Sequence, residues 1–183
     1  MFPLMCKLAM PQWVREKAWS VLQGSVTWGE DLATFAPERS VCQFCLRHVG
    51  YGVVDSATHF TCCALHDVLW HGVAGLLEEM GFPPVIRKWF TLYGPESIVV
   101  PRGRFCVVVW IWATMVAVML LARSTHRDVS SQQMAPKVSL RIFRTTLATI
   151  CRMDLANNPA VWLHRWYGFA ELDGNDNEIK YLF

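Results

Sequence analysis

Apolar residues recur every three or four positions along most of this 183-residue chain, which is the periodicity of amphipathic α-helices. The clearest example runs from Leu65 to Met80 and keeps one apolar face over about four helical turns. Gly24, Pro37 and the segment 81–84 mark points where helices end. The pattern predicts helices at residues 12–23, 29–35, 65–80, 85–93, 105–122, 136–153 and 159–169.

The same periodicity predicts which side chains these helices bury. Leu32 and Phe35 are expected to be buried in the helix at 29–35. In the helix at 85–93 the expected inward residues are Ile86, Trp89 and Phe90, and in the helix at 136–153 they are Leu140, Phe143, Leu147 and Ile150.

The stretch 105–122 is apolar all round, because it contains no charged residue and Thr114 is its only clearly polar group. A helix of this length spans about 27 Å, just enough for a bilayer core of about 30 Å. Arginines stand on both sides of the stretch, and Trp110 and Trp112 lie near its middle, whereas tryptophans of membrane helices prefer the interfaces. We therefore favour a buried core helix over a membrane span, with the span as the alternative.

These elements predict a mainly α fold, in which a central, very apolar helix is packed by C-terminal amphipathic helices. Two glycines and two prolines between residues 94 and 103 indicate a linker. The expected organisation is a helical region with a zinc knuckle at 12–93, a linker at 94–103, a second helical region at 104–170 and an acidic tail at 171–183.

Charge is distributed unevenly, although the net charge is only +2. Residues 1–101 carry a net charge of −2, residues 102–170 carry +7, and residues 171–183 carry −3. A basic stretch of this density is typical of a surface that contacts a phosphate backbone or an anionic membrane, and equally of a solvated helix face. Hydrophobic residues make up 53% of the chain and charged residues 17%, which excludes disorder over most of its length.

Seven cysteines do not form a disulfide framework, because their number is odd and four of them lie between residues 42 and 63. We find no cleavable signal peptide and expect reduced thiols, in the cytoplasm or the nucleus. Cys42, Cys45, His59 and Cys63 follow the pattern C-x2-C-x13-H-x3-C, which is close to the spacing of structural Zn²⁺ ligands.

Other choices of ligand remain open. Cys62 could replace Cys63, and His66 or His48 could replace His59. In each case four protein ligands leave no open position for water, so the site is structural and no hydrolytic chemistry follows. Glycine-rich phosphate loops, Gly-x-Ser-x-Gly and His-Glu-x-x-His are absent from the sequence.

The order of these features resembles the zinc-binding domain that follows the reverse transcriptase in non-LTR retrotransposons. The residues that carry the resemblance lie between about 12 and 80. They are R-E-K-A-W-S-V-L-Q-G in the first helix, V-C-Q-F-C at the first ligand pair, Asp55-Ser56-Ala57-Thr58-His59, and C-C-A-L-H-D-V-L-W before the apolar helix. The family places one more residue between the histidine and the last cysteine. It also carries paired catalytic aspartates and an upstream endonuclease, neither of which this chain has.

The resemblance implies a detached C-terminal piece with no catalytic residues of its own, which contacts RNA or DNA and assists a reverse transcriptase supplied in trans. Arg47, Arg87, Lys88, Arg141 and Arg144 are the expected phosphate contacts. The alternative is a small membrane protein anchored by residues 105–122.

Overall fold

The computed structural model describes residues 7–127, 134–172 and 179–181. This part of the chain is mainly α-helical, with short 3₁₀ turns between helices and an antiparallel hairpin in which Ala170 pairs with Tyr181. The helices are α2 (Gln12–Leu22), α3 (Gly29–Leu32), α4 (Gln43–His48), α5 (Ala57–Cys62), α6 (Asp67–Glu79), α7 (Arg87–Tyr93), α8 (Phe105–Arg127), α9 (Pro136–Asn157) and α10 (Pro159–Trp166), and the strands are β1 (Ala170–Leu172) and β2 (Ile179–Tyr181).

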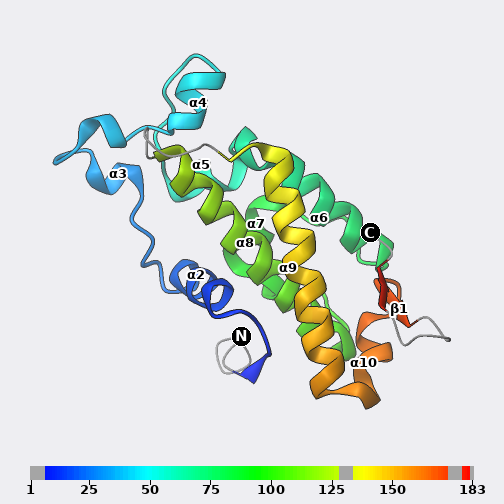
Figure 1. Ribbon diagram of the computed structural model, residues 1–183. Helices are drawn as coiled ribbons and strands as arrows, with labels where there is room; N and C mark the ends of the chain where they lie inside the picture. Colours follow the sequence, from blue (N-terminus) through cyan, green and yellow to red (C-terminus); the bar gives the residue numbers. More distant parts are fainter. Residues whose placement is uncertain (1–6, 128–133, 173–178, 182–183) are drawn as a thin grey trace.

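Helix α8 lies at the centre of the molecule, where every residue from Val107 to Leu120 is buried. Helices α2, α6, α9 and α10 pack around it, and Figure 1 shows α9 running alongside it. The predicted fold, a mainly α domain with a central apolar helix packed by C-terminal amphipathic helices, is confirmed. Within α9 the predicted stripe faces the core, since Phe143, Leu147 and Ile150 are fully buried and Leu140 is partly buried against the same cluster.

Helix α8 is the one described helix that is long and apolar enough to cross a membrane, with a mean hydropathy of 2.5 in its most apolar window. Within the protein, 83% of that 18-residue window is buried. The helix also extends five residues beyond the predicted end at residue 122. These last residues are polar, but their side chains have partners: Ser124 and Thr125 donate to carbonyls one turn earlier, and Arg123 and Arg127 bind Asp55.

Residues on both sides of the segment 94–103 belong to one hydrophobic cluster. Gly94, at φ 61°, lies against the Trp112 ring, where an added Cβ would come within 2.9 Å of the ring. The indole nitrogen of Trp112 donates to the carbonyl of Thr91 at 3.1 Å. The N-terminal end of the predicted linker is therefore packed against α8.

Three burial predictions are wrong, for Phe35, Ile86 and Trp89. Phe35 is 88% exposed, because α3 ends at Leu32 and Phe35 lies beyond it. Ile86 is 65% exposed and Trp89 is 45% exposed, although Phe90 is buried as expected. The inward face of α7 is instead formed by Phe90, Thr91 and Arg87, whose guanidinium binds Asp67.

A buried ion network joins the N-terminal third of the chain to the end of α8. The carboxylate of Asp55 accepts hydrogen bonds from Arg123 at 2.7 Å and 3.0 Å and from Arg127 at 2.8 Å. The Arg123 guanidinium also lies 4.7 Å from the centre of the Trp28 ring. The amide of Gly29 donates to the Asp55 carbonyl at 2.7 Å, in a space that leaves no room for a Cβ.

We predict that Asp55→Ala lowers the free energy of unfolding by about 3–5 kcal/mol, since it leaves two half-buried guanidinium groups without their counter-ion. Urea unfolding followed by circular dichroism measures the change. Glu30→Ala, which removes an exposed carboxylate from the neighbouring helix, is the control and should change the value by less than about 0.5 kcal/mol. Equal losses in the two variants would contradict the prediction.

Candidate metal centre

Four side chains from two separate segments converge at one end of the molecule. The ligand atoms of Cys42, Cys45, His59 and Cys63 all lie within 4.8 Å of one another. The Cys63 sulfur is 3.8 Å from that of Cys42 and 3.7 Å from that of Cys45, and the Cys45 sulfur is 3.4 Å from His59 Nε2. These sulfur distances are far longer than the bond of about 2.05 Å in a disulfide, and the cysteines are free.

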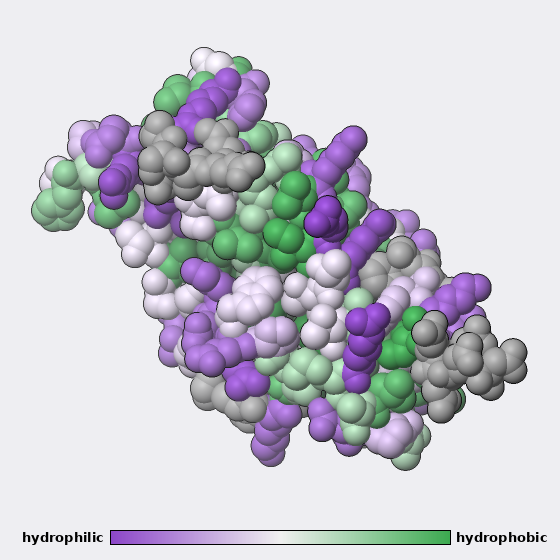
Figure 2. Space-filling model, viewed as in Figure 1, coloured by the Kyte–Doolittle hydropathy of each residue, from purple (hydrophilic) through white to green (hydrophobic). Residues whose placement is uncertain are grey.

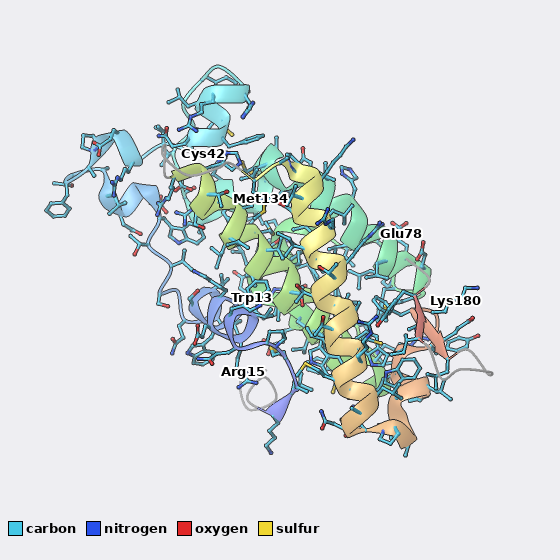
Figure 3. The ribbon with its side chains drawn as sticks, in the orientation of Figure 1. Trp13, Arg15, Cys42, Glu78, Met134 and Lys180 are labelled. Atoms are coloured by element: carbon cyan, nitrogen blue, oxygen red, sulfur yellow. The ribbon has the colours of Figure 1, made fainter. Side chains whose placement is uncertain are left out.

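The first ligand pair lies at the start of α4. Cys42 caps the N-terminus of this helix, and Cys45 lies one turn further along it. The backbone holds Cys42 in place, since its amide donates to the Val53 carbonyl at 2.7 Å beside an isolated bridge between Val41 and Val54. The chain between the two pairs therefore returns as a short hairpin. Figure 3 shows Cys42 beside the end of α8.

The second ligand pair lies on α5 and at its end. The Ser56 hydroxyl caps this helix by accepting from the amide of His59 at 3.1 Å. Cys63 ends the helix in an extended conformation and starts the 3₁₀ turn Ala64–His66. Because His59 and Cys63 are four residues apart across one helical turn, both side chains reach the same side.

The four residues are shielded from water by a small apolar cluster. Cys45 and Cys63 are buried together with Leu65 and Ala122, the latter on α8, and Phe44 packs against them. His59 and Cys42 are only partly buried. The arrangement fits a closed metal site with a partly exposed edge.

The alternative ligands lie outside this group. Cys62 is exposed, and its thiol donates to the carbonyls of Thr58 and His59. His66 is buried against the Phe60 ring, and burial lowers its pKa to about 3, so it is neutral at pH 7. His48 is exposed and contacts the Phe44 ring. The geometry thus selects Cys63 over Cys62 and His59 over the other two histidines.

The metal-free thiols differ sharply in acidity. A hydrogen bond from the Cys63 thiol, aided by His59, lowers the pKa of Cys42 to about 4. Burial, and then the charge on Cys42, raises the pKa of Cys45 to about 11. The hydrogen bond to Cys42, together with burial, raises the pKa of Cys63. These shifts favour the thiolate at Cys42 and the protonated thiol at Cys45 and Cys63 at neutral pH.

We predict that metal binding at pH 7 releases about two protons, from Cys45 and Cys63, because ligand sulfurs must be thiolates and Cys42 already is one. The logarithm of the apparent association constant should then rise with pH, with a slope of about two near neutrality. Calorimetric titration with Zn²⁺ in buffers of different ionisation enthalpy measures the proton count. Release of no protons would contradict the prediction.

One of the five residues predicted to contact nucleic acid is already bound within the protein. Arg87 is mostly buried, and its guanidinium donates to the Asp67 carboxylate at 2.6 Å and to the Cys63 carbonyl at 2.8 Å. This arginine holds the last ligand in place instead of facing solvent. The other four, Arg47 on α4, Lys88 on α7 and Arg141 and Arg144 on α9, are exposed.

Arg141 and Arg144 lie on the solvent side of α9, and Figure 2 shows hydrophilic side chains along this helix. Arg144 also lines a cleft of about 300 Å³ between α6 and α9, which includes Gly75 and Glu79.

The sequence did not reveal that Asp55, Arg123 and Arg127 join beside the ligands. The only sign of this was the arginine placed directly after the apolar stretch.

No protein-family model, curated protein or solved structure matches this chain. The resemblance to the retrotransposon zinc-binding domain therefore rests on the motif residues alone and stays a prediction.

Proposed function

We propose that the chain binds one structural Zn²⁺ ion through Cys42, Cys45, His59 and Cys63, and that the domain built on it is an accessory region contacting nucleic acid. The observation that supports the zinc site is the spacing of the ligand atoms. In a tetrahedron with Zn–S bonds of about 2.3 Å, two sulfurs are about 3.8 Å apart. A sulfur and a nitrogen are about 3.6 Å apart.

Three of the six distances between ligand atoms, 3.8, 3.7 and 3.4 Å, follow these values closely, and all six lie within 4.8 Å. Three thiolates and one imidazole form a soft donor set, which favours Zn²⁺ over Mg²⁺ or Ca²⁺. Four protein ligands fill the coordination sphere, so the ion fixes the chain and does not activate water. The zinc then links α4 to α5, two segments that share few other contacts.

We predict one zinc per chain in protein purified under reducing conditions. Cys42→Ser and His59→Ala should each abolish stoichiometric zinc and lower the melting temperature, because each removes a ligand. Cys62→Ser is the matched control, since it changes the neighbouring exposed thiol and should keep the full zinc content. Mass spectrometry of the metal content checks this. Zinc-free wild-type protein after refolding with Zn²⁺, or loss of zinc in Cys62→Ser, would refute the site.

Nucleic-acid contact is supported by the resemblance and by the exposed basic side chains of α4, α7 and α9. Arg141 and Arg144 are three residues apart on the outer face of α9, a spacing that lets both reach one phosphate backbone. The net charge of +7 between residues 102 and 170 adds a long-range attraction for polyanions. On this proposal the protein acts beside a polymerase and has no catalytic residues of its own.

We expect alanine at Arg47, Arg141 or Arg144 to weaken binding to duplex DNA equally for different sequences. Each change should also reduce the slope of log affinity against log salt by about 0.9, since one phosphate contact is lost. Fluorescence anisotropy between 25 mM and 200 mM salt measures both. Lys17→Ala, an exposed lysine on α2 outside the basic part of the chain, is the control. Absence of binding to RNA and DNA at low salt would exclude this function.

The rival function is a membrane anchor formed by α8, which is favoured by its length and hydropathy. Burial of the helix by its neighbours argues against it, since a spanning helix would expose that surface to lipid. Pelleting with membranes after carbonate extraction would support the anchor.

A further inference from the structure

Helix α7 presents an apolar face to solvent. Trp89 and Tyr93 are exposed and lie four residues apart, on one side of this helix, and Ile86, the residue just before the helix, is exposed as well. Phe90 and Thr91 on the other side are fully buried, so the orientation of the helix is set by the core. Burial of Phe90 and Thr91 therefore leaves the opposite face of α7 in solvent, where another molecule can contact it.

Two large rings on this face already form a stack. The ring centres of Trp89 and Tyr93 are 5.6 Å apart with an angle of 30° between their planes. Trp89 is 45% exposed and Tyr93 is 52% exposed. Contact between the two rings restricts the side chains before any ligand arrives, which lowers the entropic cost of binding a third flat ring.

The charge beside the stack is positive. The Lys88 ammonium lies 5.3 Å from the centre of the Trp89 ring. Arg87, the residue before it, is neutralised by Asp67 and does not contribute a free charge. The exposed acidic residue nearest in sequence to the two rings is Glu96, on the 3₁₀ turn that follows α7. A flat apolar surface with an adjoining cation suits a ligand that has aromatic rings and negative charge together.

We propose that the α7 platform, defined as Lys88, Trp89 and Tyr93, binds single-stranded nucleic acid, with a base stacked on the ring pair and a neighbouring phosphate on Lys88. Exposed aromatic rings read unpaired bases by stacking, whereas the bases of a duplex are stacked on each other and out of reach. The positive charge argues for this occupant over an apolar protein segment, which would gain nothing from Lys88. This inference rests on the proposed nucleic-acid function and names the strand type it takes.

The test compares fluorescein-labelled oligo(dT) and a duplex of equal length by anisotropy, using the zinc-loaded full chain. Wild-type protein should bind the single strand more tightly. Trp89→Ala and Tyr93→Ala should each weaken single-strand binding about tenfold and leave duplex binding unchanged. Trp89→Phe should restore most of the loss, because a ring remains. Val99→Ala, at an 87% exposed apolar residue outside α7, is the control and should change neither.

The outcomes separate this inference from the function on which it rests. Binding of wild type to both probes with no effect of Trp89→Ala overturns the platform and leaves the general nucleic-acid function standing. Binding to neither probe overturns both. Loss of self-association in Trp89→Ala, with nucleic-acid binding unchanged, assigns the face to a protein partner and overturns the platform.

A second measurement does not depend on any variant folding. Ultraviolet cross-linking of wild-type protein to an oligonucleotide containing 5-bromouracil should attach the base to the peptide that contains Trp89 and Tyr93. Attachment only to other peptides would overturn the proposal. Melting temperature and zinc content of Trp89→Ala should equal those of wild type, since the ring lies outside the core and the metal centre.

Discussion

Burial of the apolar part of α8, from Val107 to Leu120, is the constraint on which the rest of this structure depends. A helix that is apolar on every side cannot face water at any point, so it must be covered all round. The chain meets this requirement with amphipathic helices from before and after it in sequence, which join in one cluster with α8 at the centre. Gly94, at the start of the segment 94–103, packs against the Trp112 ring and so helps to cover α8.

The end of α8 is also where the metal centre meets the core. If the proposed Zn²⁺ is bound, the ion and three thiolates would carry a net charge of −1, which would be costly to hold in a partly buried site without a counter-charge. Asp55 with Arg123 and Arg127 carries a net charge of +1. These residues and Cys42 surround one small cavity, so the two opposite charges lie next to each other. On the proposed function, Arg123 and Arg127 would balance the charge of Asp55 and of the bound ion together.

Local rules were enough to predict the longer helices and the segment that holds the candidate ligands, but not the short helices α4 and α5 that carry them. The apolar periodicity located α8 and α9, and the cysteine spacing selected Cys42 and Cys45 because two sulfurs on one turn can only point to a common centre. The choice between Cys62 and Cys63 depended on where α5 ends, and that required the fold. Burial of Trp89 was predicted wrongly because the 3.6-residue period allows two overlapping faces on a seven-residue helix. The pairing of Arg87 with Asp67 decides between them, and no local pattern reveals a partner twenty residues away.

The hydrophobic cluster around α8 has a consequence for how the molecule opens. None of the described residues 29–59 belongs to that cluster, although Trp28 and Phe60 on either side of them do. This lobe is held by Asp55, by the ligands and by its own short hairpin. We therefore expect its amide protons to exchange through local opening more readily than those of α8. If the proposed zinc is bound, its removal should favour local opening of residues 29–59 while the helices around α8 stay packed.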